Sequence, residues 1–105
     1  IEGIGDEFIP EIVDLSIIED IILINDLDSI NMARKLSKNL GLGVGISSGA
    51  NLLAAIILNE KFNEKVVTVF ADDNKKYLTT ELSLDIDNNP NFLSNKIKLI
   101  NYEIV

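Results

Sequence analysis

The chain contains no cysteine and no histidine. Without cysteine it can form neither a disulfide bond nor a metal site built on thiolates. Without histidine it lacks the side chain that most often serves as a general base and as a metal ligand. These two absences exclude several common kinds of catalytic and metal centre from this chain.

Positive charge is also scarce, because 9 lysines and arginines stand against 17 aspartates and glutamates, for a net charge of −8. Such a chain is a poor partner for nucleic acid and for anionic membranes. Apolar runs stay shorter than the roughly 18 residues that a membrane span needs, and no signal-peptide pattern is present. We therefore expect a cytoplasmic protein that binds neither nucleic acid nor membranes.

Hydrophobic residues make up 47% of the 105 residues, which is enough for a packed core. This length fits one small domain or a part of a larger one. The first residues, Ile1-Glu2-Gly3-Ile4-Gly5, contain no methionine and read as the middle of a loop. We therefore expect the sequence to be a segment of a longer chain.

Three apolar, β-branched runs, residues 20–24, 44–46 and 66–70, are typical of strands buried on both faces of a parallel sheet. Helical spacing separates them, over about 26–40 and from about Ser48 to Asn59. The alternation of strand and helix predicts an α/β fold in three layers with a parallel sheet. Alternating residues in the tail, 96–105, add a weak signal for an edge strand.

The first helix carries clear start and stop signals. Asn25 or Asp26 can cap its N-terminus, Asp28 adds favourable negative charge, and Gly41 is a good C-terminal stop. The positions expected to face the sheet are Leu27, Ile30, Ala33, Leu36 and Leu40.

The stretch Gly45-Ile46-Ser47-Ser48-Gly49-Ala50 places hydroxyls and free backbone N–H groups between a predicted strand and a predicted helix. Ligands of open α/β sheets bind at the carboxyl ends of strands, and helix N-termini hold negative charge well. This turn is therefore the first candidate for a binding site. The alternative is an ordinary capped helix, with Ser47 or Ser48 as the N-cap.

Three parts of the chain resemble one family, the cysteine synthases and cystathionine β-synthases, in matching order and spacing. The similar parts are Gly3-Ile4-Gly5 followed by Phe8-Ile9-Pro10, the turn Gly45–Ala50, and Val66–Phe70 followed by Asp72 and Tyr77–Thr80. The resemblance covers residues 1–84 and implies the C-terminal part of a catalytic domain that uses pyridoxal phosphate in the fold type II arrangement. Residues 85–105 would be a linker and tail.

The resemblance implies a β-replacement enzyme, with cysteine synthase, which makes L-cysteine from O-acetylserine and sulfide, as the leading expectation. A cystathionine β-synthase, which takes homocysteine instead, is the alternative, and a non-catalytic α/β interaction domain is a third. Family members are commonly homodimers, and some dock a serine acetyltransferase.

The same resemblance assigns residues to the cofactor. Ser47 would hydrogen-bond the pyridine nitrogen, and the backbone of Gly3 would lie beside the ring. The lysine that forms the Schiff base lies upstream in the family, so we expect no catalytic residue and no metal ligand in this segment. Asp6-Glu7 and the turn at 71–76 depart from the cysteine synthase pattern, which leaves the sulfur donor and acceptor open.

Overall fold

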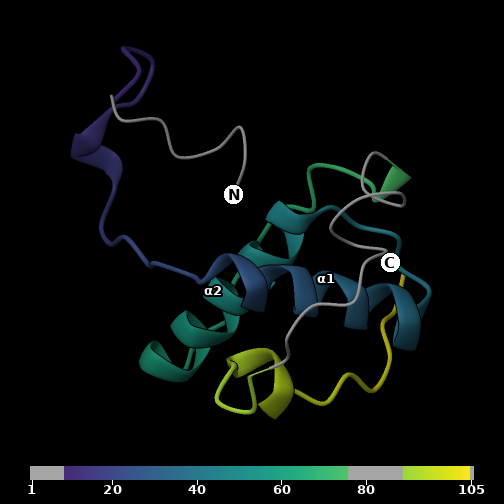
Figure 1. Ribbon diagram of the computed structural model, residues 1–105. Coiled ribbons are helices and arrows are strands. Elements are labelled where there is room, and N and C mark those ends of the chain that lie inside the picture. The colour runs from purple at the N-terminus through teal and green to yellow at the C-terminus, as the bar shows by residue number, and fades with distance from the viewer. Residues whose placement is uncertain (1–8, 76–88, 105) are drawn as a thin grey trace.

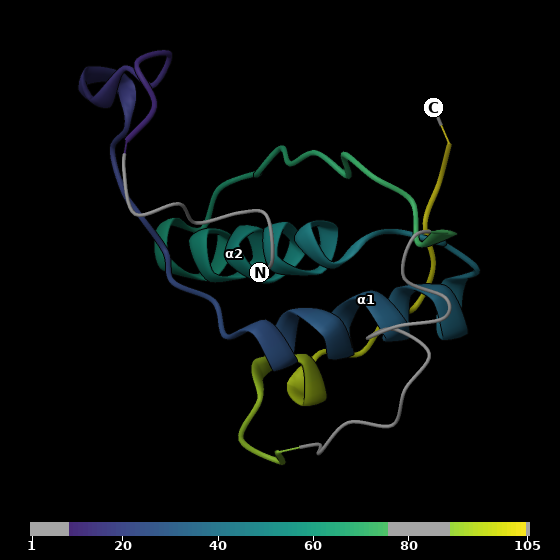
Figure 2. The same ribbon diagram turned by 45° about the horizontal axis from the view of Figure 1, so that its top comes forward.

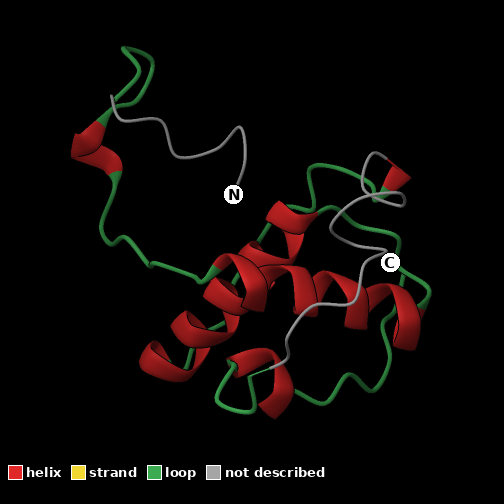
Figure 3. Ribbon diagram, viewed as in Figure 1, coloured by secondary structure: helices red, strands yellow, loops and turns green. Residues whose placement is uncertain are grey.

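The computed structural model describes residues 9–75 and 89–104. Its elements are helices joined by loops (Figures 1 and 3). In chain order these are the 3-10 helix η1 (Leu15–Ile17), α1 (Asp26–Leu40), α2 (Ile46–Phe62) and the 3-10 helix η3 (Leu93–Lys96). The two long helices form the body, and the segment before α1 extends away from it as an arm (Figure 1).

Helix α1 begins and ends where the sequence predicts. The side chain of Asn25 accepts hydrogen bonds from the N–H groups of Leu27, at 2.9 Å, and Asp28, at 3.3 Å. Gly41 ends the helix in the left-handed conformation, with φ of 69°, and its N–H donates to carbonyls of the last turn. Asn25 is therefore the cap, and the prediction of Gly41 as the stop is confirmed.

Helix α2 starts earlier than predicted. Gly45 is its N-cap, and no side chain makes a capping hydrogen bond there. Ser47 and Ser48 lie inside the first turn, so the prediction that one of them is the N-cap is wrong. Gly45 has the extended backbone that an N-cap requires, with φ of −77° and ψ of 173°, and helical geometry already begins at Ile46.

The two long helices cross one another (Figures 1 and 2), and Gly49 of α2 lies against the backbone of α1. A β-carbon on Gly49 would stand 2.1 Å from the carbonyl oxygen of Ser29 and 3.0 Å from the backbone nitrogen of Ala33. Only a residue without a side chain allows the backbones to approach so closely. The core lies around this crossing and consists of Met32, Ala33, Leu36, Val44 and Leu53.

The predicted apolar face of α1 is largely confirmed. Ile30, Ala33 and Leu36 are buried, and Leu40 packs half-buried against the core. Leu27 is the exception, because 41% of its surface remains exposed. Leu27 therefore lies outside the contact between α1 and α2, although Ser29 of the same turn is buried.

The predicted parallel sheet is not formed within the described residues, which contain no strand (Figure 3). Residues 20–24 and 66–70 are loops, Ile46 belongs to α2, and residues 97–104 are irregular. One isolated antiparallel bridge joins Val44 to Asp73. A strand exists only through hydrogen bonds to a neighbouring strand, and these apolar runs lie against helices or solvent instead.

Polar contacts from α1 hold η3. The Asp28 carboxylate accepts the N–H groups of Leu93 and Ser94, both at 3.0 Å, at the start of η3. The Lys35 ammonium donates to the carbonyls of Ser94 and Ile97 near its end. A negative group at the first N–H groups and a positive one at the last carbonyls complement the dipole of this short helix.

Candidate functional site

The candidate site is the turn that leads into α2, and a second segment holds it in place. The N–H of Gly45 donates to the carbonyl of Asp72 at 2.8 Å, and the N–H of Asn74 donates to the carbonyl of Gly43 at 3.1 Å. These bonds bring together two of the parts that the sequence singled out, the turn and the polar segment after residues 66–70.

The start of α2 has backbone N–H groups without an acceptor among the described residues. The N–H groups of Ser48 and Gly49 donate to the Gly45 carbonyl, at 3.1 and 3.4 Å. Those of Ile46 and Ser47 come before the first intrahelical acceptors, and no side chain caps them. The helix dipole adds partial positive charge at the same place. The turn can therefore receive a hydrogen-bond acceptor.

The two serines of the turn differ in environment. Ser47 is half-buried, and its hydroxyl makes no hydrogen bond to any described residue. Ser48 is fully buried, with 0% of its surface exposed, and its hydroxyl has no partner within the described part of the chain. Ser47 is thus the serine that a ligand can reach, while Ser48 faces protein.

The other predicted site residue, Gly3, lies outside the described residues. Asp72 serves as a turn residue: its carboxylate accepts the N–H of Asp73 at 2.9 Å. Sequence reasoning missed Asn74, whose side-chain oxygen would stand 2.9 Å from a β-carbon on Gly43 and so covers that glycine. The described residues hold no group of acidic side chains that could bind a metal ion.

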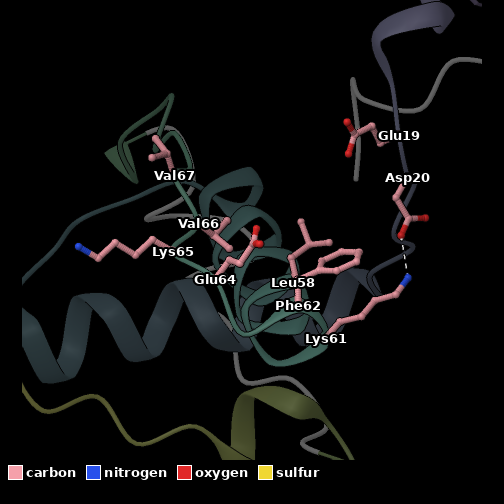
Figure 4. Close-up of a pocket in the computed structure, with 9 residues that line it drawn as sticks. All are labelled: Glu19, Asp20, Leu58, Lys61, Phe62, Glu64, Lys65, Val66 and Val67. Atoms are coloured by element: carbon pink, nitrogen blue, oxygen red, sulfur yellow. Dashed lines mark hydrogen bonds and ion pairs between the residues drawn. The ribbon is translucent and has the colours of Figure 1, made fainter.

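A cavity of about 560 Å³ lies at the opposite end of α2 (Figure 4). Leu58 and Phe62 of α2 line it between residues 19–20 on one side and 66–67 on the other. At its rim Lys61 pairs with Asp20 at 3.1 Å. This hydrogen bond is the main cause that lowers the pKa of Asp20, with a smaller contribution from the N–H of Ile21. No pattern in the sequence indicated this cavity.

The chain is 46% identical over 83 residues to cysteine synthase B of Campylobacter jejuni. The matched region covers 78% of this chain and 27% of that protein. It also superposes on the hydrogen sulfide-producing enzyme of Fusobacterium nucleatum, with a TM-score of 0.80 and 50% sequence identity over 90% of this chain and 29% of that one. This chain is related to the cysteine synthases. Identity at this level over so much of the chain confirms the resemblance that the three sequence motifs indicated.

The relationship to the cysteine synthases concerns a part of those proteins, since the chain spans about 27% of the length of the curated relative. Cystathionine beta-synthase of Dictyostelium discoideum is similar as well, with 36% identity over 92 residues, 84% of this chain and 18% of that protein. No protein-family model matches the chain. Among the described residues, no helix has the length and apolarity needed to cross a bilayer.

The α/β fold class is supported by these neighbours, whereas the described residues contain no sheet. The superposition takes in 90% of this chain and 29% of the solved structure, at a TM-score of 0.80. The course of the chain is therefore close to that of the corresponding part of this neighbour.

Proposed function

We propose that this chain forms part of an enzyme that uses pyridoxal phosphate for β-replacement, and specifically of a cysteine synthase that makes L-cysteine from O-acetylserine and sulfide. The observation that carries the proposal is the Ser47 hydroxyl at the start of α2, which bonds to none of the described residues. The 46% identity to a cysteine synthase supports the choice of substrates. The segment alone is proposed to be inactive.

The residues of the turn fit this cofactor. Ser47 is half-buried and its hydroxyl has no partner in residues 9–75 or 89–104, so it can donate a hydrogen bond to the pyridine nitrogen. The cofactor supplies an electron sink when bound. A neutral hydroxyl leaves the pyridine nitrogen largely unprotonated, which weakens that sink and favours loss of the β-substituent over return of the α-proton. Gly3 is proposed to lie beside the ring.

The lysine that holds the cofactor covalently is proposed to come from outside this segment. Two lysines of the described chain already have partners: Lys35 binds carbonyls of η3, and Lys61 pairs with Asp20. An activated lysine needs a desolvated setting, and Lys38, Lys65, Lys75, Lys96 and Lys98 are exposed. The complete enzyme is proposed to be a cytoplasmic homodimer that can dock a serine acetyltransferase.

A cystathionine β-synthase, which joins a serine derivative to homocysteine, is the second candidate. The similarity to the Dictyostelium discoideum protein favours it. Both candidates use the same proposed role for Ser47 and differ in the sulfur compound that they accept. A non-catalytic interaction domain is the third candidate, in which this turn would bind no cofactor.

A chimaera tests the proposal. The 83 matched residues of the Campylobacter jejuni enzyme are replaced by this chain, and cofactor absorbance is followed as O-acetylserine and then sulfide are added. We expect a bound-cofactor band that changes with O-acetylserine and returns with sulfide. A response to serine with homocysteine alone would favour the second candidate, and a chimaera that folds but binds no cofactor would favour the third.

Ser47→Asp in this chimaera is expected to keep the cofactor and slow β-elimination. Ser48→Ala is the matched control, because Ser48 is the neighbouring hydroxyl but is buried against protein. An unchanged elimination rate in Ser47→Asp would refute the role given to Ser47.

A further inference from the structure

Gly43, which precedes the turn that carries Ser47, is not required to be glycine by its backbone conformation. Among the described glycines only Gly41 has a positive φ. The space beside Gly43 is occupied instead. A β-carbon there would stand 2.9 Å from Oδ1 of Asn74, 3.3 Å from its Cγ and 3.4 Å from its Nδ2. The carboxamide of Asn74 therefore lies over the α-carbon of Gly43, and a side chain at this position would displace it.

The backbones of the same two segments are bonded to one another. The N–H of Asn74 donates to the carbonyl of Gly43 at 3.1 Å, and the N–H of Gly45 donates to the carbonyl of Asp72 at 2.8 Å. These two bonds form the isolated antiparallel bridge. A pairing this short is marginal by itself, so the carboxamide at its end adds a contact that matters. We call the two bonds and the carboxamide together the Asn74 clasp.

The Asn74 clasp ends where α2 begins. Gly45 is the N-cap of α2, and no side chain caps the helix there. Within the described residues, the one hydrogen bond from the Gly45 N–H goes to residues 72–74. Ser47 follows Gly45 within the first helical turn, so a shift of the N-cap also shifts the Ser47 hydroxyl. The contact of Gly49 with α1 holds the helix one turn further along.

Asn74 differs from its neighbours in the same segment. The carboxylate of Asp72 accepts the N–H of Asp73 at 2.9 Å, and that of Asp73 accepts the N–H of Lys75 at 3.0 Å. Asp73 and Lys75 are exposed, whereas Asn74 is half-buried. The side chain that reaches Gly43 is therefore that of Asn74. It stands in the turn 71–76, which departs from the cysteine synthase pattern, so the contact is a property of this chain.

We propose that Asn74 is a positioning residue for Ser47. Its carboxamide holds Gly43 against residues 72–74, which fixes the N-cap of α2 and thereby the direction of the Ser47 hydroxyl. This inference rests on the proposed function, which gives that hydroxyl its acceptor. Hydrogen bonds weaken steeply when their geometry is poor. Asn74 itself is not proposed to contact the cofactor.

A double-mutant cycle in the chimaera tests this role, with the rate at which O-acetylserine changes the cofactor band as the measurement. Asn74→Ala should keep the cofactor and slow this step by about tenfold, since small misplacements of a reacting group are costly. Asn74→Asp, which keeps a planar group of the same size, should restore most of the rate. Asn39→Ala removes the same group from the exposed surface of α1 and is the matched control.

The cycle is closed in the Ser47→Ala background. There Asn74→Ala should slow the step no further, because the hydroxyl that it positions is gone. An unchanged rate in Asn74→Ala would overturn the proposal. So would an equal slowing with and without the Ser47 hydroxyl, since Asn74 would then act through another group.

Amide exchange by NMR in the chain itself tests the Asn74 clasp without any cofactor. The Gly45 N–H should exchange about fivefold faster or more in Asn74→Ala, and the amide shift of Ser47 should change. Gly43→Ala displaces the same carboxamide, so it should have the same effect, and the double variant should add little. Asn39→Ala should change neither signal.

The two experiments separate this inference from the proposed function. A chimaera that folds without a cofactor band would refute the proposed function, while altered Gly45 and Ser47 signals in Asn74→Ala would still uphold the positioning of Ser47. A normal cofactor response with unaltered Gly45 and Ser47 signals in Asn74→Ala would do the reverse.

Discussion

Gly49→Ala tests the helix crossing on which the body depends. The new β-carbon would stand 2.1 Å from the Ser29 carbonyl oxygen. Real β-carbons essentially never come closer than 3.0 Å to another heavy atom, so α1 must move away from α2. Overpacking lowers the free energy of unfolding by about 1–3 kcal/mol. The loss here should lie near the upper end, because the obstacle is backbone and cannot rotate away. Alanine recovers about 1 kcal/mol through its higher helix propensity. The net expected loss is about 2 kcal/mol.

Urea unfolding followed by circular dichroism measures this loss as a lower midpoint. Gly43→Ala is the first control, since the atoms nearest to its β-carbon would belong to the Asn74 side chain, the first at 2.9 Å, and a side chain can rotate away. Ala50→Gly, on the same turn of α2, is the second and should cost about 1 kcal/mol through propensity. If Gly49→Ala instead stabilised the chain, as in an exposed helix, the crossing described here would be refuted.

The remaining predictions concern single polar groups. Asp28→Ala leaves two N–H groups of η3 without their acceptor and should cost about 3 kcal/mol, with faster amide exchange in η3. Ser48→Ala removes a buried hydroxyl that has no partner among the described residues and should stabilise the chain by up to about 1 kcal/mol in urea unfolding; a clear loss of stability would show that the hydroxyl has a partner. The pKa of Asp20 is lowered mainly by the hydrogen bond from Lys61. The stability this pair adds is therefore present above the ordinary value of 3.8 and lost as pH falls through the lower folded-state pKa. An NMR titration should show the Asp20 pKa rising in Lys61→Met.

The helices were predictable because their signals are local. Asn25 sits two and three residues before the N–H groups that it caps, and Gly41 meets carbonyls of the preceding turn. Such contacts depend on neighbours that the sequence shows directly. The boundary of α2 was less predictable, because Gly45 caps it through its backbone conformation while two better capping residues follow.

Contacts between distant residues could not be read from the sequence. The bond between the Asp28 carboxylate and the N–H of Ser94 spans 66 positions, and no local pattern marks it. The prediction of strands was wrong for a related reason. Residues 66–70 have the composition of a buried strand, but a strand also needs a partner, and composition does not say whether one is present. The candidate site was predictable in part. The sequence motif located the turn and the resemblance named Ser47, while the burial of the two serines came from the structure.

Two backbone contacts among the described residues hold the candidate site in position. Gly49 lets α1 contact α2 two residues after Ser47, which sets the start of α2 relative to the core. On the other side, the Asp72 carbonyl holds the N–H of Gly45. Neither contact involves residues 20–24 or 66–70. The proposed function therefore predicts that the Ser47 hydroxyl takes the same position in the separate chain and in the chimaera, because the contacts that hold it lie within this chain.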